Sequence, residues 1–176
     1  MDEEKVVRAA QKQEPQAFEQ LYNMHFDRIY RYLYFKTGDR EAAEDMTQEV
    51  FLKAWQSIGS YKIKGMPFSA WLFRIAHNLL VDHYRKKTRT KELPLEEAEA
   101  PWEQNPAAIL EKDIRRKELA QACERLPVAQ REVISLRFVA GLSTAEVAEA
   151  IGKKEGAVKA LQHSALVSLR RSLAWK

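Results

Sequence analysis

The sequence of 176 residues has almost no cysteine and no long hydrophobic run. Its one cysteine, Cys123, excludes an internal disulfide, which favours a reducing compartment and makes this residue a small apolar filler in a helical pattern. No apolar run approaches the roughly 18 residues of a membrane-spanning helix, and the N-terminus, MDEEKVVRAA, is charged. We therefore expect a cytoplasmic protein with no signal peptide and no membrane insertion of its own.

Other missing patterns exclude most enzyme classes. Nothing in residues 1–91 alternates with a period of two, so no strands are expected there. No nucleotide-binding loop or metal motif occurs, and we expect no cofactor, no metal and no catalytic residue. One enzymatic alternative is a metal hydrolase that uses His77, Asp82 and His83. It is disfavoured because helical spacing places His77 away from the face of the other two.

Charge is unevenly distributed along the chain, although the net charge is only +4. Residues 1–91 carry 16 Lys and Arg against 12 Asp and Glu, and residues 114–176 carry 12 against 6. Between them, residues 92–113 carry 1 against 7. Two basic blocks on either side of an acidic segment indicate two modules that each contact an anionic partner. The acidic segment that joins them would be repelled by the same partner.

Apolar residues recur at helical spacing on both sides of the bridge, which predicts an all-α protein. The expected helices cover 2–12, 17–37, 40–57, 68–91, 106–125, 128–140, 144–151 and 155–172. Gly38 and Gly59 would end two of them, and Asp39 would cap a third. The prolines and acidic residues of 92–105 predict a linker, with Asn105 capping the helix that follows.

The longest uninterrupted predicted helix, 68–91, differs in composition between its two halves. Its first half is apolar and aromatic, and its second half is basic. Aromatic rings beside a cationic track suit single-stranded nucleic acid, because bases stack on rings and Lys or Arg neutralises phosphates. The alternative is that the rings belong to the core and the charges to a solvated helix end.

Residues 142–172 predict a helix-turn-helix. Ser143 and Glu146 form a capping-box pattern, a short helix follows, and Gly152 occupies the turn before a longer helix. An ordinary helical hairpin is the alternative. On the longer helix, Val158, Leu161, Ala165 and Leu169 should face the core. His163 as a metal ligand is disfavoured because no second ligand lies near it in sequence.

Three stretches together resemble the extracytoplasmic-function (ECF) sigma factors of the sigma-70 family. They are AEDMTQEVFLKAW at 43–55, FSAWLFRIAHN at 68–78, and the region from Leu126 to Arg171. The resemblance implies a polymerase-binding and minus-ten-recognising region 2 bundle over 1–91. It also implies a flexible acidic linker over 92–109 and a minus-35-reading region 4 helix-turn-helix over 110–176. We expect no added C-terminal sensory domain.

The resemblance implies partners and site residues. Core RNA polymerase would be bound by Asp45, Gln48, Glu49, Phe51, Leu52 and Trp55. The minus-ten element, as duplex and as non-template single strand, would be bound by Lys62, Lys64, Phe68, Trp71, Arg74, Asn78, Arg85, Lys86, Lys87 and Arg89. The minus-35 element would be bound by Ser143, Lys154, Glu155, Lys159, Gln162, His163, Ser164, Arg170 and Arg171. An inhibitory anti-sigma factor is a further expectation.

The sequence departs from the family pattern in the last helix. Lys153 and Lys154 precede it where the family often has a Ser or Thr cap, and Gln162 to Leu166 replace a second arginine-rich turn. The minus-35 preference therefore cannot be transferred from relatives. The remaining alternative function is a helix-turn-helix regulator that binds duplex DNA without polymerase, which would leave the aromatic and basic helix unused.

Overall fold

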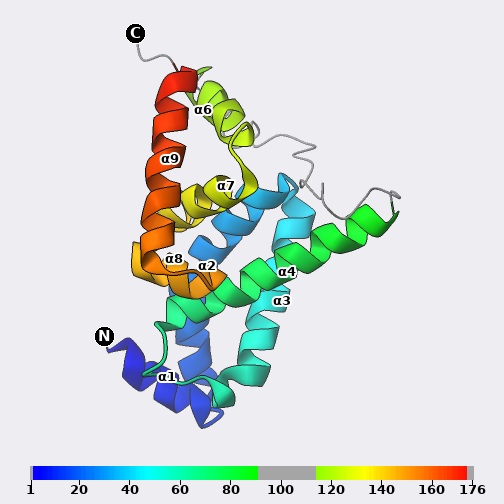
Figure 1. Cartoon of the computed structure of the whole chain (residues 1–176). Helices are drawn as coiled ribbons and strands as arrows, with labels where there is room; N and C mark the ends of the chain where they lie inside the picture. The colour runs from blue at the N-terminus through cyan, green and yellow to red at the C-terminus, as the bar shows by residue number, and fades with distance from the viewer. Residues whose placement is uncertain (1, 91–113, 174–176) are drawn as a thin grey trace.

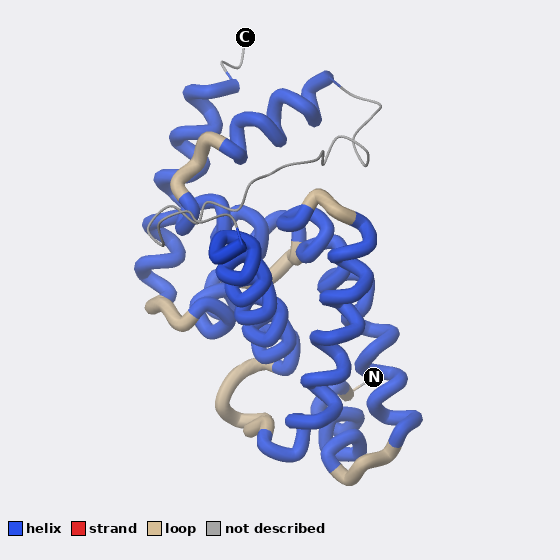
Figure 2. The backbone as a smooth tube through the Cα atoms, turned by 90° about the vertical axis from the view of Figure 1, so that its right-hand side faces the viewer, coloured by secondary structure: helices blue, strands red, loops and turns tan. Residues whose placement is uncertain are grey.

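The structure, a computed structural model, describes residues 2–90 and 114–173, and its regular elements there are all helical (Figure 1, Figure 2). The helices are α1 (Glu3–Gln11), α2 (Pro15–Thr37), α3 (Arg40–Ser57), η1 (Ile58–Ser60), α4 (Phe68–Thr90), α6 (Ile114–Glu124), α7 (Val128–Ile134), η3 (Ser135–Val139), α8 (Thr144–Ile151) and α9 (Glu155–Leu173). The all-α prediction is confirmed for this part of the chain. None of its helices is both long and apolar enough to cross a bilayer.

Helix ends follow the local sequence signals. Pro15 occupies the first turn of α2, and Gly38 ends that helix with a left-handed φ of 65°. Asp39 caps α3 by accepting a hydrogen bond of 3.2 Å from the Ala42 amide. The predicted linker, including the Asn105 cap, lies outside the described residues.

Helices α1 to α4 form a bundle in which the apolar faces of α2, α3 and α4 meet. Large side chains that are fully buried there include Leu21, Ile29, Leu33, Leu72 and Phe73. The long helix α4 runs across this bundle, and its basic end extends beyond it (Figure 1). The bundle thus fixes the apolar half of α4 and leaves the far half projecting.

The C-terminal helices pack around α9. Val158, Ala165 and Leu169 are buried and Leu161 is partly buried, as the periodicity predicted. Two other large apolar residues of this half are exposed although their segments have helical periodicity. Leu119 is 44% exposed, and Phe138, which lies within the π-helical turn η3, is 58% exposed. Cys123 is buried beside Leu126, and burial raises the pKa of its thiol, in agreement with a filler role.

The two halves share one apolar core. Residues of α2 and α4, among them Leu33 and Phe73, belong to the same buried cluster as Val133, Leu136 and Val147 of the C-terminal half. In Figure 1, α8 lies against the first half of α4 and α7 lies against the end of α2. The described chain is therefore closed, with the helix-turn-helix seated on the bundle.

Candidate nucleic-acid interface

The outer face of α3 is polar and acidic with an apolar centre. Asp45, Gln48 and Glu49 are exposed, and Leu52 is 56% exposed among them. Glu49 pairs with Lys53 at 3.3 Å. This face fits an approaching helix that supplies basic groups around an apolar contact.

Two of the residues predicted to bind polymerase lie inside the bundle. Phe51 is only 4% exposed, with its ring 4.6 Å from that of Tyr22. Trp55 is partly buried, and its ring lies 4.9 Å from Phe18. Phe51 therefore supports the outer face of α3 from behind and does not belong to the contact surface.

An aromatic cluster stands at the start of α4. The Trp71 ring lies 5.0 Å from Tyr61 and 5.5 Å from Phe68, and Phe68 is buried. Tyr61 donates a hydrogen bond of 2.5 Å to the Met66 carbonyl, which closes the loop between α3 and α4. Trp71 is thus held by two rings and remains partly exposed.

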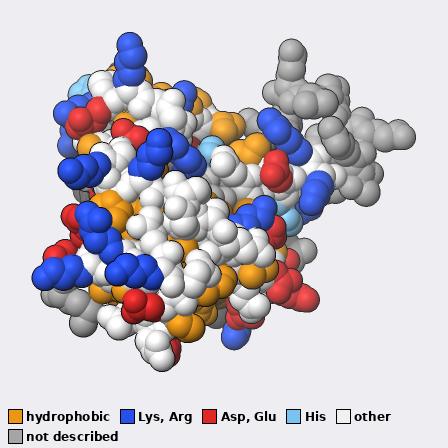
Figure 3. Space-filling view, turned by 90° about the horizontal axis from the view of Figure 1, so that it is seen from below, with side chains coloured by type: hydrophobic (Ala, Val, Ile, Leu, Met, Phe, Trp, Pro, Cys, Tyr) orange, Lys and Arg blue, Asp and Glu red, His pale blue; other side chains and the backbone are white. Residues whose placement is uncertain are grey.

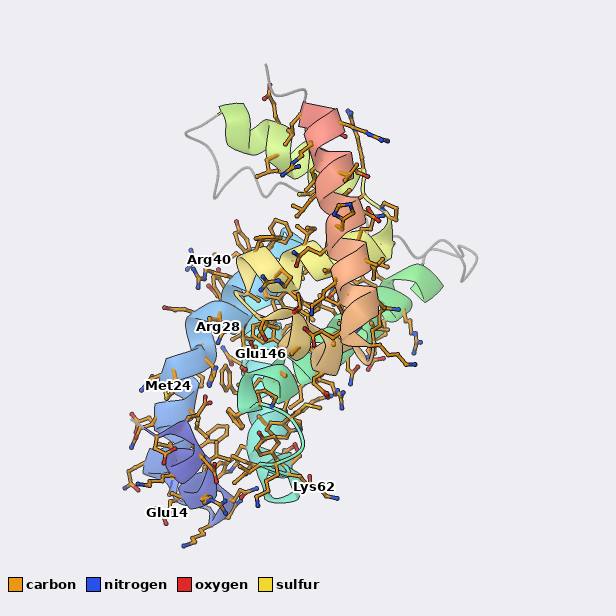
Figure 4. The ribbon with its side chains drawn as sticks, turned by 60° about the vertical axis from the view of Figure 1, so that its left-hand side comes forward. Glu14, Met24, Arg28, Arg40, Lys62 and Glu146 are labelled. Carbon is orange, nitrogen blue, oxygen red and sulfur yellow. The ribbon has the colours of Figure 1, made fainter. Side chains whose placement is uncertain are left out.

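The loop beside this cluster carries two exposed cations. Lys62 and Lys64 both project from it, and Figure 4 shows Lys62 pointing into solvent. A partly exposed ring next to exposed ammonium groups is suited to one stacked base and its adjoining phosphate.

A hollow follows the aromatic cluster along the seam between α3 and α4. This cavity of about 460 Å³ is lined by Lys53, Gln56, Ser57, Ile75, Asn78, Leu79 and Asp82. Asn78 is exposed and shares a helical face with Trp71, because the two are seven residues apart. Sequence reasoning found Asn78 but missed Lys53, Gln56 and Asp82. The spacing of Trp71, Ile75, Asn78 and Asp82 on α4 was the available signal.

The far end of α4 is basic, as predicted. Arg85, Lys86 and Lys87 are exposed, and Arg85 lies 4.0 Å from Asp82. Arg89 falls within α4, but its side chain is outside the described part. Seen from below, Lys and Arg side chains gather along the margins of the molecule, one group beside the grey residues (Figure 3).

Arg74 does not join Trp71 and Asn78. Its guanidinium donates to the Glu149 carbonyl, with Nε at 3.1 Å, and it lies 4.0 Å from the Glu149 carboxylate. The assignment of Arg74 to the minus-ten element stays a prediction, because this guanidinium is engaged elsewhere in the closed chain. Arg74 instead contacts α8 of the C-terminal half.

The helix-turn-helix has the predicted geometry. Ser143 accepts a hydrogen bond from the Glu146 amide at 3.1 Å, and Glu146 accepts one from the Ser143 amide at 2.8 Å. Gly152 ends α8 with a φ of 66°, which favours glycine there. Thr144 then donates to Glu155 at 2.8 Å and joins the two helices of the motif.

The outer face of α9 presents polar side chains to solvent. Lys154, Lys159, His163 and Ser164 are exposed, as are Arg170 and Arg171 in the last turn. Lys159 lies 2.9 Å from Glu155, and the pKa of Glu155 is lowered by its bonds to Lys159 and Thr144. Gln162 accepts from Arg137 at 2.9 Å and is partly buried, so it has less freedom than its neighbours.

The capping box yields a stability prediction. Because Ser143 satisfies an amide at the start of α8, Ser143→Ala should lower the free energy of unfolding by about 1 kcal/mol. Urea denaturation followed by circular dichroism measures this change. Ser172→Ala, at an exposed position near the end of α9, is the matched control. An unchanged midpoint for Ser143→Ala would show that the cap contributes nothing.

Comparisons with known proteins agree with this arrangement. Residues 21–90 match the model of Sigma-70 region 2, and residues 122–171 match that of Sigma-70, region 4. The chain is 39% identical over 170 residues to the ECF RNA polymerase sigma factor BldN of Streptomyces coelicolor, covering 96% of this chain and 64% of BldN. It is 32% identical over 179 residues to SigW of Bacillus subtilis, covering 96% of this chain and 95% of SigW.

A solved structure is similar across both halves. CnrH in complex with the cytosolic domain of CnrY matches with a TM-score of 0.75 and 26% identity, over 96% of this chain and 95% of CnrH. The chain spans less than two thirds of BldN but nearly all of SigW and CnrH. On the two matched regions and these relatives, the chain belongs to the ECF sigma factors of the sigma-70 family.

Proposed function

We propose that this protein is a promoter-specificity subunit that binds core RNA polymerase and directs initiation through minus-ten and minus-35 elements, without catalysis of its own. One observation carries the proposal. A single chain holds both an aromatic face with an adjoining hollow and basic end on α4, suited to single-stranded DNA, and a helix-turn-helix suited to duplex DNA. In this proposal residues 1–91 bind polymerase and the minus-ten element. Residues 92–109 link them to a minus-35-binding unit at 110–176.

Core polymerase would dock on the outer face of α3. Asp45 and Glu49 offer carboxylates, and Leu52 offers the apolar centre that a binding hot spot needs. Gln48 adds a polar contact. Charged groups around a central apolar residue suit a basic, amphipathic helix of the partner.

The non-template strand would follow α4 from its start to its end. One base stacks on Trp71, which Tyr61 and Phe68 hold in place. The next base enters the hollow, where the Asn78 amide offers both a donor and an acceptor to a base edge. Arg85 and the lysines beside it then neutralise phosphates.

The upstream duplex would receive α9. Lys159, His163 and Ser164 lie on its exposed face, where side chains can reach base edges in a major groove. The ion pair of Lys159 with Glu155 is solvent-exposed and therefore weak, so Lys159 can exchange it for a DNA contact. Arg170 and Arg171 would contact phosphates.

Loss of a single cation on α9 should weaken the upstream contact. Lys159→Ala is expected to lower minus-35 affinity by about tenfold, as loss of one charge-assisted contact at a DNA interface does. Footprinting of the holoenzyme measures protection of the upstream element. Lys5→Ala, at an exposed position on α1, serves as the control. Protection by the Lys159 variant equal to that by the unchanged protein would remove Lys159 from the site.

Partner binding discriminates the sigma function from its alternative. Co-elution with core polymerase on size exclusion is expected, together with little sequence-specific binding to free duplex at physiological salt. Specific duplex binding without polymerase, and no co-elution, would instead identify a simple helix-turn-helix regulator.

We also infer an inhibitory protein partner, because CnrH was solved in complex with the cytosolic domain of CnrY. With such partners, we infer that the protein acts in the cytoplasm.

A further inference from the structure

Glu132 of α7 is a buried carboxylate whose side-chain partners come from the other half of the chain. It is 7% exposed. Tyr32 and Lys36 of α2 donate hydrogen bonds to its two oxygens, and His77 Nδ1 of α4 lies 3.1 Å from Oε1. The N-terminal bundle thus contains a three-sided carboxylate receptor, and Glu132 fills it.

The receptor stabilises a charged carboxylate inside a protein core. Burial alone would raise the pKa of Glu132, but the Lys36 ammonium and the His77 hydrogen bond outweigh it and hold the pKa well below its usual range. Lys36 is itself only 8% exposed. Removing one partner of such a pair leaves the other charge buried and uncompensated, which strongly destabilises the contact. The closed arrangement therefore depends on this pair.

Three flanking contacts close the same interface. Arg28 of α2 donates to the Ala140 carbonyl at 2.9 Å, and Ser69 of α4 donates to Glu146 at 2.5 Å. Arg74 donates to the Glu149 carbonyl. Burial would raise the pKa of Glu146, but its hydrogen bonds with Ser69 and Ser143 and the charge of Arg28 hold that pKa below its usual range. Figure 4 shows Arg28 near Glu146. Together with Glu132, these contacts join the C-terminal half to α2 and α4, and two of them hold α8 on α4.

The closed arrangement of the two halves is incompatible with binding both promoter elements at the same time. Positions minus ten and minus thirty-five are about 25 base pairs apart, which is about 85 Å of straight B-DNA at 3.4 Å per step. Here α8 of the duplex-binding motif rests directly on α4, the helix assigned to the single strand. Arg74, on that helix, is also held by Glu149. The closed chain cannot span the two elements.

We propose that Glu132 and its receptor of Tyr32, Lys36 and His77 form an intramolecular lock that holds the chain closed until it docks on polymerase. Only the open state of the free protein can dock on polymerase in this proposal. The lock therefore sets the fraction of open protein, and the apparent affinity for polymerase falls in proportion to that fraction. The functional consequence rests on the proposed sigma function, whereas the closure itself does not.

The test measures closure directly. Dyes are placed at two exposed positions that flank the contact between the halves, Asp27→Cys in the middle of α2 and Ala157→Cys in the first turn of α9, in a Cys123→Ala background. They report energy transfer between the two halves of the full chain. The variants are Glu132→Gln, Lys36→Met and the double variant. Glu118→Gln, at an exposed position on α6, is the control. Circular dichroism and urea denaturation check that each variant remains folded.

The lock predicts high transfer for the unchanged protein and for Glu118→Gln, and reduced transfer for Glu132→Gln. The open-to-closed ratio should rise by at least about tenfold, as expected when one partner of a buried pair is lost. The double variant should restore part of the closure, because no buried charge is left unpaired. Unchanged transfer in a folded Glu132→Gln variant would overturn the lock.

A second readout separates the lock from the sigma function. Association of Glu132→Gln with core polymerase should be faster than that of the unchanged protein, in proportion to the gain in open state. If energy transfer falls but neither protein binds polymerase, the lock stands and the proposed function fails. If both bind polymerase at equal rates although transfer falls, the regulatory role of the lock is refuted.

Discussion

Replacing Trp71 by alanine is expected to reduce promoter opening by about 10- to 100-fold and to leave binding to core polymerase unchanged. The magnitude follows from base–aromatic stacking, which contributes about 1–3 kcal/mol per base. Trp71 is partly exposed on α4, whereas the polymerase face lies on α3. Asn78→Ala removes one donor and one acceptor from the hollow and should reduce opening by about tenfold. Permanganate footprinting of unpaired thymines measures opening.

Two controls separate ring chemistry from folding. Trp71→Phe keeps an aromatic face and should retain most of the opening activity. Asn78 is exposed, so its alanine variant should unfold at the same urea concentration as the unchanged protein. If both alanine variants open promoters normally, α4 does not bind the single strand. A Phe variant as impaired as the Ala variant would indicate a packing defect instead of lost stacking.

Leu52→Arg should weaken binding to core polymerase by about 30-fold or more. Leu52 is an exposed apolar residue at the centre of the α3 face, and losing a central contact of this kind costs about 2 kcal/mol. An arginine there must also be desolvated on docking. Because the residue is 56% exposed in the free chain, the variant should fold normally. Fluorescence anisotropy of labelled protein titrated with core polymerase gives the dissociation constant.

Met24→Arg is the matched control. Met24 is 44% exposed on α2, and Figure 4 shows it pointing away from the neighbouring helices. The same chemical change at that position should leave polymerase affinity unaltered. Equal losses in both variants would indicate a general effect of added charge, and no loss in either would remove the α3 face from the interface.

Local signals in the sequence were sufficient to predict helix ends and the helix-turn-helix. Gly38, Asp39 and the box formed by Ser143 with Glu146 behave as their residue types require. These features depend on backbone groups a few residues away, so composition and spacing determine them. The outer face of α3 and the basic end of α4 were likewise visible as helical faces.

Contacts between distant residues could not be predicted in this way. Arg74 reaches a carbonyl 75 residues away, and Glu132 reaches a residue 100 positions before it. A helical pattern shows which face is apolar but does not identify its partner. Phe138 illustrates a second limit, because it lies within the π-helical turn η3, where residues do not keep the spacing of an α-helical pattern.

Transcription from a randomised promoter library, with core polymerase and with or without this protein, tests the central claim most directly. If the protein is a promoter-specificity subunit, start sites should appear only when it is present, and they should share two upstream elements, one near minus ten and one near minus thirty-five. Trp71→Ala should reduce these starts and Met24→Arg should not. A folded protein that binds core polymerase but produces no dependent start sites would contradict the account.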